Sequence, residues 1–257
     1  MQILKTMLLS SGLSIMACGA SDASFDQAEM DSRDSPIIGG AVDTGDPSVV
    51  AIFSHPRNSY YGSLCTGSVI APRVVLTAAH CLDPRVAGSG NVVDVYRGTS
   101  LNSATRLAVS SVAFDPAFDP DNLDRGHDVG VVILSQATTL KPLPFNRDPN
   151  TAPKQGSTVR IVGYGSSTHA DSGAGTKRSV STTVGGVSSS FLLIGGSNQQ
   201  TCHGDSGGPA FQNINGVETL VGLTSFGMDR SQTNVCFGGG YDTRVEQVLG
   251  FIDKYLQ

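Results

Sequence analysis

The sequence predicts an all-β protein, and two observations support this fold class. Glycine accounts for 31 of the 257 residues, and apolar residues occur mostly in short β-branched runs rather than in long stripes at helical spacing. The chain is long enough for one large domain or two small lobes. Its formal net charge of −5 is mild and it contains no basic tract, so we expect no nucleic-acid partner.

Residues 1–18 have the layout of a secretory signal. Lys5 precedes an apolar stretch that runs to Met16 and is too short for a stable membrane anchor. Two outcomes follow: cleavage near Ala20, or lipidation of Cys18 at a loose match to a bacterial lipobox. We favour lipidation, which tethers an exported protein to a membrane surface. Residues 19–36 are polar and acidic, which predicts a disordered spacer or propeptide.

The next two segments combine apolar runs with a candidate base. IIGG at 37–40 begins abruptly and, taken alone, indicates only a first strand. LCTGSVIAPRVVLTAAHC at 64–81 has two apolar runs around residues 71–72, which predicts two strands joined by a turn. The second run leads into His80, whose small neighbours leave its ring room to face a cleft. His80 is therefore a candidate general base.

GHDVGVVIL at 126–134 places Asp128 directly before an apolar strand. A carboxylate in that position can accept a hydrogen bond from Nδ1 of a histidine and turn its other ring nitrogen toward a serine. We expect His127 to be structural or at the surface. The remaining carboxylates nearby occupy a polar loop and are expected to be solvated: Asp115, Asp119, Asp121 and Asp124.

CHGDSGGP at 202–209 sets Ser206 among glycines, with an acidic residue before it. Such a turn exposes the serine hydroxyl, and the N–H groups of Gly204 and Ser206 can then point at one developing oxyanion. Taken alone, the segment fits an ordinary glycine-rich turn equally well. No histidine follows Ser206, so the order of an α/β-hydrolase triad is excluded and the base must lie upstream.

These four motifs, IIGG, LTAAHC, HDVGVVIL and CHGDSGGP, resemble those of the trypsin-like (chymotrypsin-family) serine proteases and occur in that family's order over residues 37 to about 245. The resemblance implies two six-stranded antiparallel β-barrels, about 37–140 and 157–244, with the active site between them and a C-terminal α-helix at 245–257. The strand-poor run 141–156 fits the crossing between the barrels.

The C-terminal segment has apolar residues at helical spacing, which we expect to pack on the second barrel. They are Val245, Val248, Leu249, Ile252, Tyr255 and Leu256.

The resemblance implies an exported serine endopeptidase with a catalytic triad of His80, Asp128 and Ser206. It also implies a zymogen, in which cleavage before Ile37 frees an ammonium that pairs with Asp205. Pro36 stands where the family usually has a basic residue, so the activating protease is open.

Besides Cys18, four cysteines allow three pairings. The resemblance implies Cys65 with Cys81 and Cys202 with Cys236, bonds that an exported protein can keep oxidised.

The resemblance also assigns a substrate pocket, formed by Gln200, Ser225, Phe226, Gly227 and Gly240. Because Gln200 replaces the aspartate of trypsin-type enzymes, the sequence does not predict strict cleavage after Arg or Lys. We expect the substrate residue before the cleaved bond to have an apolar or mid-sized polar side chain.

We also predict the positions of several residues near the triad and the pocket. The hydroxyl of Ser225 is expected to bond the Asp128 carboxylate, and His203 to lie at the pocket mouth or in solvent. Asp242 could lend negative charge to the pocket, but we expect it to be solvated or salt-bridged. His55 and His169 receive no role.

No metal-ligand cluster or phosphate-binding loop stands out, so we expect no metal and no cofactor. We expect a monomer that acts on a protein or peptide substrate. The alternative is a non-catalytic binding or regulatory protein on the same fold, either an unprocessed zymogen or a pseudoenzyme.

Overall fold

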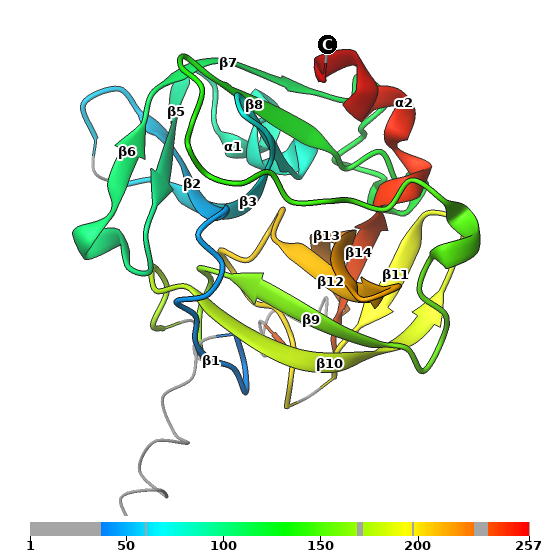
Figure 1. Cartoon of the computed structure of the whole chain (residues 1–257). Helices are drawn as coiled ribbons and strands as arrows, with labels where there is room; N and C mark the ends of the chain where they lie inside the picture. The colour runs from blue at the N-terminus through cyan, green and yellow to red at the C-terminus, as the bar shows by residue number, and fades with distance from the viewer. Residues whose placement is uncertain (1–36, 60, 169–171, 197, 229–235, 257) are drawn as a thin grey trace, which may run out of the picture.

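The computed structural model describes residues 37–59, 61–168, 172–196, 198–228 and 236–256. These residues form two seven-stranded antiparallel sheets, each curled on itself (Figure 1). The signal, the possible lipidation site at Cys18 and the spacer at 19–36 lie outside the described residues, as does His169. Within the described part of the chain, no helix has the length and apolar character needed to cross a membrane.

The first sheet has the strand order β6-β5-β2-β3-β4-β8-β7. Strands β5 and β7, near its two ends, contact each other, so the sheet curls toward closure. Its strands are β2 (Val49–Pro56), β3 (Ser63–Ala71), β4 (Val74–Thr77), β5 (Asn91–Arg97), β6 (Thr105–Leu107), β7 (Val109–Phe114) and β8 (Gly130–Leu134).

The second sheet has the order β1-β10-β11-β14-β13-β12-β9, and a further pairing of β10 with β9 closes six of its strands into a ring. Its strands are β1 (Ala41–Val42), β9 (Thr158–Gly163), β10 (Arg178–Val187), β11 (Phe191–Ile194), β12 (Pro209–Ile214), β13 (Val217–Gly227) and β14 (Gly240–Arg244). The predicted all-β, two-barrel class is confirmed.

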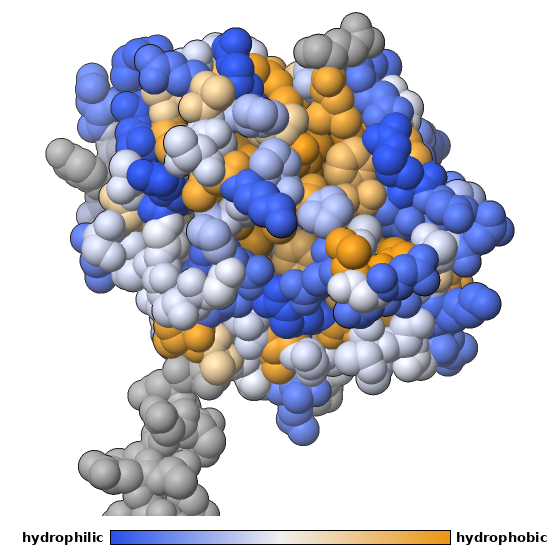
Figure 2. Space-filling view, viewed as in Figure 1, coloured by the Kyte–Doolittle hydropathy of each residue, from blue (hydrophilic) through white to orange (hydrophobic). Residues whose placement is uncertain are grey.

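Strand β4 shows how the two barrels pack. Side chains alternate across a strand, and Val75 accordingly packs inside the first barrel, whereas Val74 and Leu76 face a second cluster. That cluster also holds Phe211 and Leu223 of the second barrel. All four β4 residues are buried because both faces of the strand are covered. Figure 2 shows hydrophobic residues toward the middle of one face of the molecule, with hydrophilic residues over most of its edge.

Two boundaries differ from the sequence-based expectation. β1 pairs with β10, Ala41 opposite Ser179, so this strand joins the second sheet although 37–140 was expected to form the first barrel. The expected helix at 245–257 is broken into η5 (Val245–Gln247), α2 (Leu249–Ile252) and η6 (Asp253–Tyr255). Gly250 weakens helix propensity in the middle of this segment.

The expected apolar stripe of this C-terminal segment packs as core, with Val245, Val248 and Ile252 buried against both barrels. The other short helical segments are η1 (Ala79–Cys81), α1 (Pro84–Ala87), η2 (Leu101–Ser103), η3 (Leu123–Arg125) and η4 (Pro149–Thr151).

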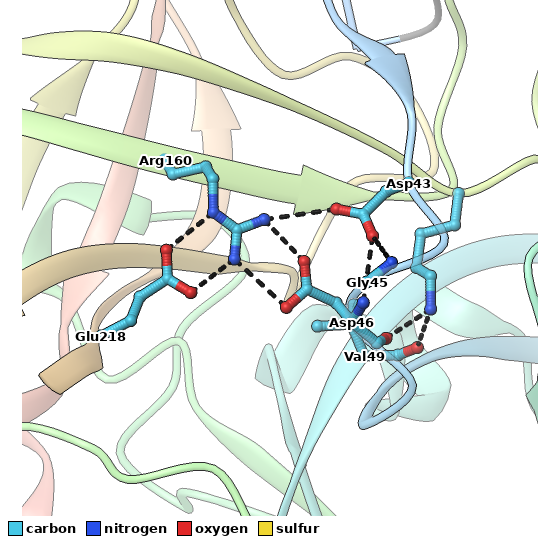
Figure 3. Close-up of polar contacts among 7 residues, drawn as sticks. Asp43, Gly45, Asp46, Val49, Arg160 and Glu218 are labelled. Carbon is cyan, nitrogen blue, oxygen red and sulfur yellow. Dashed lines mark hydrogen bonds and ion pairs between the residues drawn. The ribbon is translucent and has the colours of Figure 1, made fainter.

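An ion-pair network fixes the segment between β1 and β2 onto the second barrel (Figure 3). Arg160 on β9 binds three carboxylates, with contacts of 2.6 Å to Asp46, 2.6 Å to Glu218 and 3.2 Å to Asp43. Lys177 adds hydrogen bonds from its Nζ to the carbonyl oxygens of Asp46 and Val49. The chain after Ile37 is therefore anchored by Arg160 of β9, which Glu218 of β13 also binds, and by Lys177, the residue preceding β10.

Candidate active site

His80 lies in η1, immediately after the buried strand β4. The preceding Ala78 and Ala79 are fully buried, and their small side chains let the turn pack tightly while the His80 side chain stays 19% exposed. The Cys65–Cys81 disulfide ties this turn to β3. The histidine is thus held at the edge of the first barrel.

Asp128 is 1% exposed and lies directly behind His80. Its carboxylate accepts hydrogen bonds from the backbone N–H of His80 at 2.9 Å, from Nδ1 of His80 at 2.8 Å, and from the hydroxyl of Ser225. The Thr243 hydroxyl donates to its carbonyl oxygen at 3.2 Å. Because Nδ1 is engaged by a carboxylate, Nε2 of His80 is the ring nitrogen left to act as a base.

The electrostatics of this pair follow from burial and proximity. Burial disfavours the charged imidazolium, but the charge of Asp128 and its hydrogen bond together raise the pKa of His80. Burial likewise disfavours the Asp128 carboxylate, yet His80 and the hydroxyl of Ser225 hold the pKa of Asp128 below its ordinary value. The pair is therefore built to hold a positive charge on the histidine beside an ionised aspartate.

Ser206 lies on a turn between β11 and β12 whose glycines adopt positive φ, +98° at Gly204 and +76° at Gly207. The turn is fastened to the first barrel by Thr66, whose N–H donates to the Ser206 carbonyl at 2.8 Å and whose hydroxyl donates to the Gly204 carbonyl at 2.9 Å. A Cβ on Gly207 would lie 2.0 Å from Oγ1 of Thr77. Only glycine fits a turn pressed this closely against β4.

The amides of Gly204 and Ser206 donate no hydrogen bond to any described residue. Both residues line a hollow between the barrels that also contains His80. Unpaired amides at the edge of a hollow are available to bind a developing oxyanion. The structure thus places His80, Asp128 and Ser206 around one site.

A second pocket of about 270 Å³ adjoins Ser206. Three of the predicted pocket residues line it, Ser225, Phe226 and Gly227, but Gln200 and Gly240 are not among its described lining residues. His203 also lines it, and sequence reasoning did not assign five further lining residues: Thr201, Cys202, Thr224, Cys236 and Gly239.

Gln200 is buried and does not line this pocket. It is 1% exposed, and its Oε1 accepts a hydrogen bond from the N–H of Gly239, a lining residue. Gly240 is buried in β14. His203 is exposed and lines both hollows, as expected. Of the two, Gln200 thus contacts the pocket only through the backbone of Gly239.

Asp242 departs from the expectation of a solvated or salt-bridged carboxylate. It is 1% exposed, and neither carboxylate oxygen has a hydrogen-bond partner among the described residues. Strand alternation in β14 turns its side chain into the second barrel, whereas Tyr241 is half-buried. Burial, and then the neighbouring charge of Asp205, raise the pKa of Asp242 well above its ordinary value.

The residues implicated in activation are also buried. Ile37 is fully buried, and Ile38 exchanges backbone hydrogen bonds with Gln200 at 3.1 and 3.3 Å. The Asp205 carboxylate accepts from the N–H groups of Gly165 at 2.7 Å and Cys202 at 2.9 Å, and burial raises its pKa to about 7.

The remaining candidates lie away from this site. His127 is exposed and contacts Asp115 at 3.0 Å, and His55 contacts Asp94 at 3.3 Å.

The cysteines form Cys65–Cys81 and Cys202–Cys236, the pairings that the resemblance implies. His80 and two sulfurs form a compact group, but both sulfurs belong to the first disulfide and so supply no thiolate for a metal.

Two antiparallel barrels with a histidine–aspartate pair and a serine between them define the two-barrel class of serine proteases. Comparison with known proteins agrees, since the family model described as Trypsin matches residues 37–252. The chain belongs to the trypsin family and is a serine endopeptidase.

Individual relatives are distant. Bovine chymotrypsin-like elastase family member 1 is 26% identical over 229 residues, covering 82% of this chain and 85% of the relative. Mouse tryptase is 25% identical over 250 residues, covering 86% and 88%. The solved structure of neuropsin, a serine protease expressed in the limbic system of mouse brain, matches with a TM-score of 0.66 at 23% identity over 85% of this chain and 99% of that one. At 23% identity, the likeness to neuropsin supports the fold and no further property.

Proposed function

We propose that the protein hydrolyses peptide bonds through an acyl-enzyme. Ser206 attacks the scissile carbonyl, His80 takes the hydroxyl proton at Nε2 and delivers it to the leaving amine, and Asp128 orients the ring. A water molecule then attacks the acyl-enzyme by the same route in reverse. The observation that carries this proposal is the 2.8 Å contact of Nδ1 with a buried carboxylate, in a histidine that shares a hollow with Ser206.

The oxyanion is held by the N–H groups of Gly204 and Ser206. The position of these two N–H groups supports this role. Thr66 fixes the turn to β3, and the glycine conformations leave both amides without an acceptor among the described residues. Preorganised donors of this kind typically contribute about 2.7–4 kcal/mol each to transition-state stabilisation.

We infer that the protein is made as a zymogen and activated by cleavage before Ile37. Ile37 has a φ of +43°, a conformation that is strained for a β-branched residue. Because φ is defined by the preceding carbonyl carbon, cleavage before Ile37 removes this constraint. The ammonium that cleavage creates is then available to the buried Asp205 carboxylate, which in the uncleaved chain is held only by backbone amides among the described residues.

Export is part of the same proposal. The two disulfides are typical of proteins that mature in an oxidising compartment. Residues 1–18 supply the signal, with lipidation at Cys18 as the favoured form.

The test combines a fluorophosphonate probe with N-terminal sequencing of the protein recovered from its natural source. A mature start at Ile37 and a label on Ser206 are expected, and Ser206→Ala should abolish labelling. A protein that starts at Cys18 or near Ala20 and takes no label would instead be a non-catalytic binding or regulatory protein.

A further inference from the structure

Asp242 is a buried carboxylate that the proposed chemistry does not use. Both of its oxygens lack a partner among the described residues, and Oδ2 would lie 3.1 Å from a Cβ built on Gly222, so the group faces a closely packed barrel interior. Taking a carboxylate out of water without a compensating partner costs several kcal/mol. Such a group either stays protonated or is ionised beside a cation, and the uncleaved chain supplies no cation from its described residues.

The charged groups around Asp242 add no compensation. Arg244, on the same strand, is paired with Glu246 at 2.7 Å. On β13, Glu218 is bound to Arg160 at the surface, and β11 and β12 carry no charged residue. Asp205 is the charged group that acts on Asp242, and its negative charge makes the site more unfavourable.

Ile37 occupies the same part of the barrel interior. Its side chain packs in one buried cluster with Leu192 and Ala210. Leu192 is the register partner of Asp242 on the adjacent strand. Ala210 and Asp242 both crowd Gly222, with their Cβ atoms 3.3 and 3.0 Å from a Cβ built there. The future amino terminus and the Asp242 carboxylate therefore share one region, and Asp205 is near enough for its charge to act on Asp242.

We propose that Asp242 is a positioning residue that, together with Asp205, binds the α-ammonium of Ile37 after activation. This inference rests on the proposed cleavage before Ile37. Hydrolysis of that bond leaves a carboxylate on the released segment and an ammonium on Ile37, which brings one positive charge to a pair of acids that had none. The ammonium stabilises the ionised form of both acids, and Asp205 in turn fixes the turn that carries Gly204 and Ser206.

A second carboxylate changes the alkaline limit of activity. An isolated α-amino group has a pKa of about 7.7–8.0, and each nearby carboxylate raises it. The active conformation is lost as pH rises through the pKa of this ammonium, so two carboxylates extend activity to higher pH than one. Removing Asp242 should therefore move the alkaline limb to lower pH.

The experiment uses mature protein that begins at Ile37, produced from a chain in which residues 32–36 are replaced by the recognition sequence of a site-specific protease. We compare kcat/KM against pH for this protein and for Asp242→Asn, which removes the charge at nearly constant shape. In the variant, the alkaline decline of kcat/KM should occur at a pH lower by about one unit or more. Asp242→Ser gives the same comparison if the Asn variant does not fold.

The matched control is Asp94→Asn, which removes a largely buried carboxylate of the first barrel that pairs with Arg106. Its alkaline limb should coincide with that of the parent protein. An alkaline limb in Asp242→Asn that is unchanged or moved upward overturns the inference. Failure of the proposed function looks different, because mature parent protein would then take no fluorophosphonate label at Ser206 at any pH.

Discussion

Replacing Asp128 by Asn tests whether this carboxylate orients and charges His80. The change keeps the size of the side chain but places an amide where Nδ1 finds a carboxylate oxygen at 2.8 Å. If the amide nitrogen faces Nδ1, the ring must turn its unprotonated nitrogen inward and carry its proton on Nε2. His80 then cannot accept the proton of Ser206.

The magnitude follows from the contacts that are lost. A hydrogen bond to a charged group contributes about 1.5–3 kcal/mol, and the Asn variant loses two such contributions: the charged bond at Nδ1 and the stabilisation of the imidazolium formed during attack. Their sum of about 3–6 kcal/mol corresponds to a roughly 10²- to 10⁴-fold lower kcat. KM should change little, because Asp128 is buried behind His80 and does not line either hollow.

The pH dependence gives a second readout. In the parent protein, activity is lost as pH falls through the pKa of His80, which Asp128 raises above its ordinary value of 6.5. Without the carboxylate that pKa falls, so the acid limb of the residual activity should move to lower pH.

The matched control is Asp115→Asn, because Asp115 contacts Nδ1 of the exposed His127 at 3.0 Å with the same pair of groups. Steady-state hydrolysis of a peptide-library-derived substrate, with circular dichroism as a check on folding, provides the comparison. Equal activity of the two variants would refute the assigned role of Asp128.

Two further pairs of substitutions, each a test and its control, probe how the fold and the site are held. Arg160→Met leaves three carboxylates without their shared cation and should cost about 3–5 kcal/mol, seen as a thermal midpoint roughly 10 °C lower, whereas Glu218→Gln removes only the most exposed partner and should cost under about 1 kcal/mol. Gly207→Ala drives a Cβ to 2.0 Å from Oγ1 of Thr77 and should abolish labelling of Ser206, while Gly216→Ala, at a similar φ of +85° in open space, should cost about 1–2 kcal/mol and leave labelling intact. Labelling that survives Gly207→Ala, or equal thermal midpoints for the two charge variants, would contradict this account.

The residues placed correctly from sequence belong to short motifs with strong local rules. The two apolar runs at 64–81 become β3 and β4, and the small residues after β4 leave His80 partly exposed. Gly204 and Gly207, on either side of Ser206, adopt positive φ, which the absence of a Cβ permits. In each case the conformation depends on a few residues that are adjacent in sequence, so the sequence pattern is enough to predict it.

Contacts between distant segments were not predictable in this way. Thr66 fastens the Ser206 turn through two hydrogen bonds across some 140 positions, and a threonine in a strand carries no sign of that partner. The resemblance assigns Gln200 to the substrate pocket, but Gln200 is not among the described lining residues and contacts one of them, Gly239, through a hydrogen bond. Asp242 is expected from sequence to be solvated or salt-bridged, and only its 1% exposure in the folded β14 shows that its side chain faces the barrel interior.

The anchoring of the segment after Ile37 bears on activation by an unidentified protease. Arg160 and Lys177 hold the chain from residue 43 to 49 in the uncleaved protein. A cut before Ile37 therefore frees a new terminus only six residues from its anchor, within about 20 Å even if fully extended. So short a tether keeps the ammonium at a high effective concentration near Asp205. Under the proposed activation, the position of the cut then matters more than the identity of the protease, which accommodates the proline at position 36.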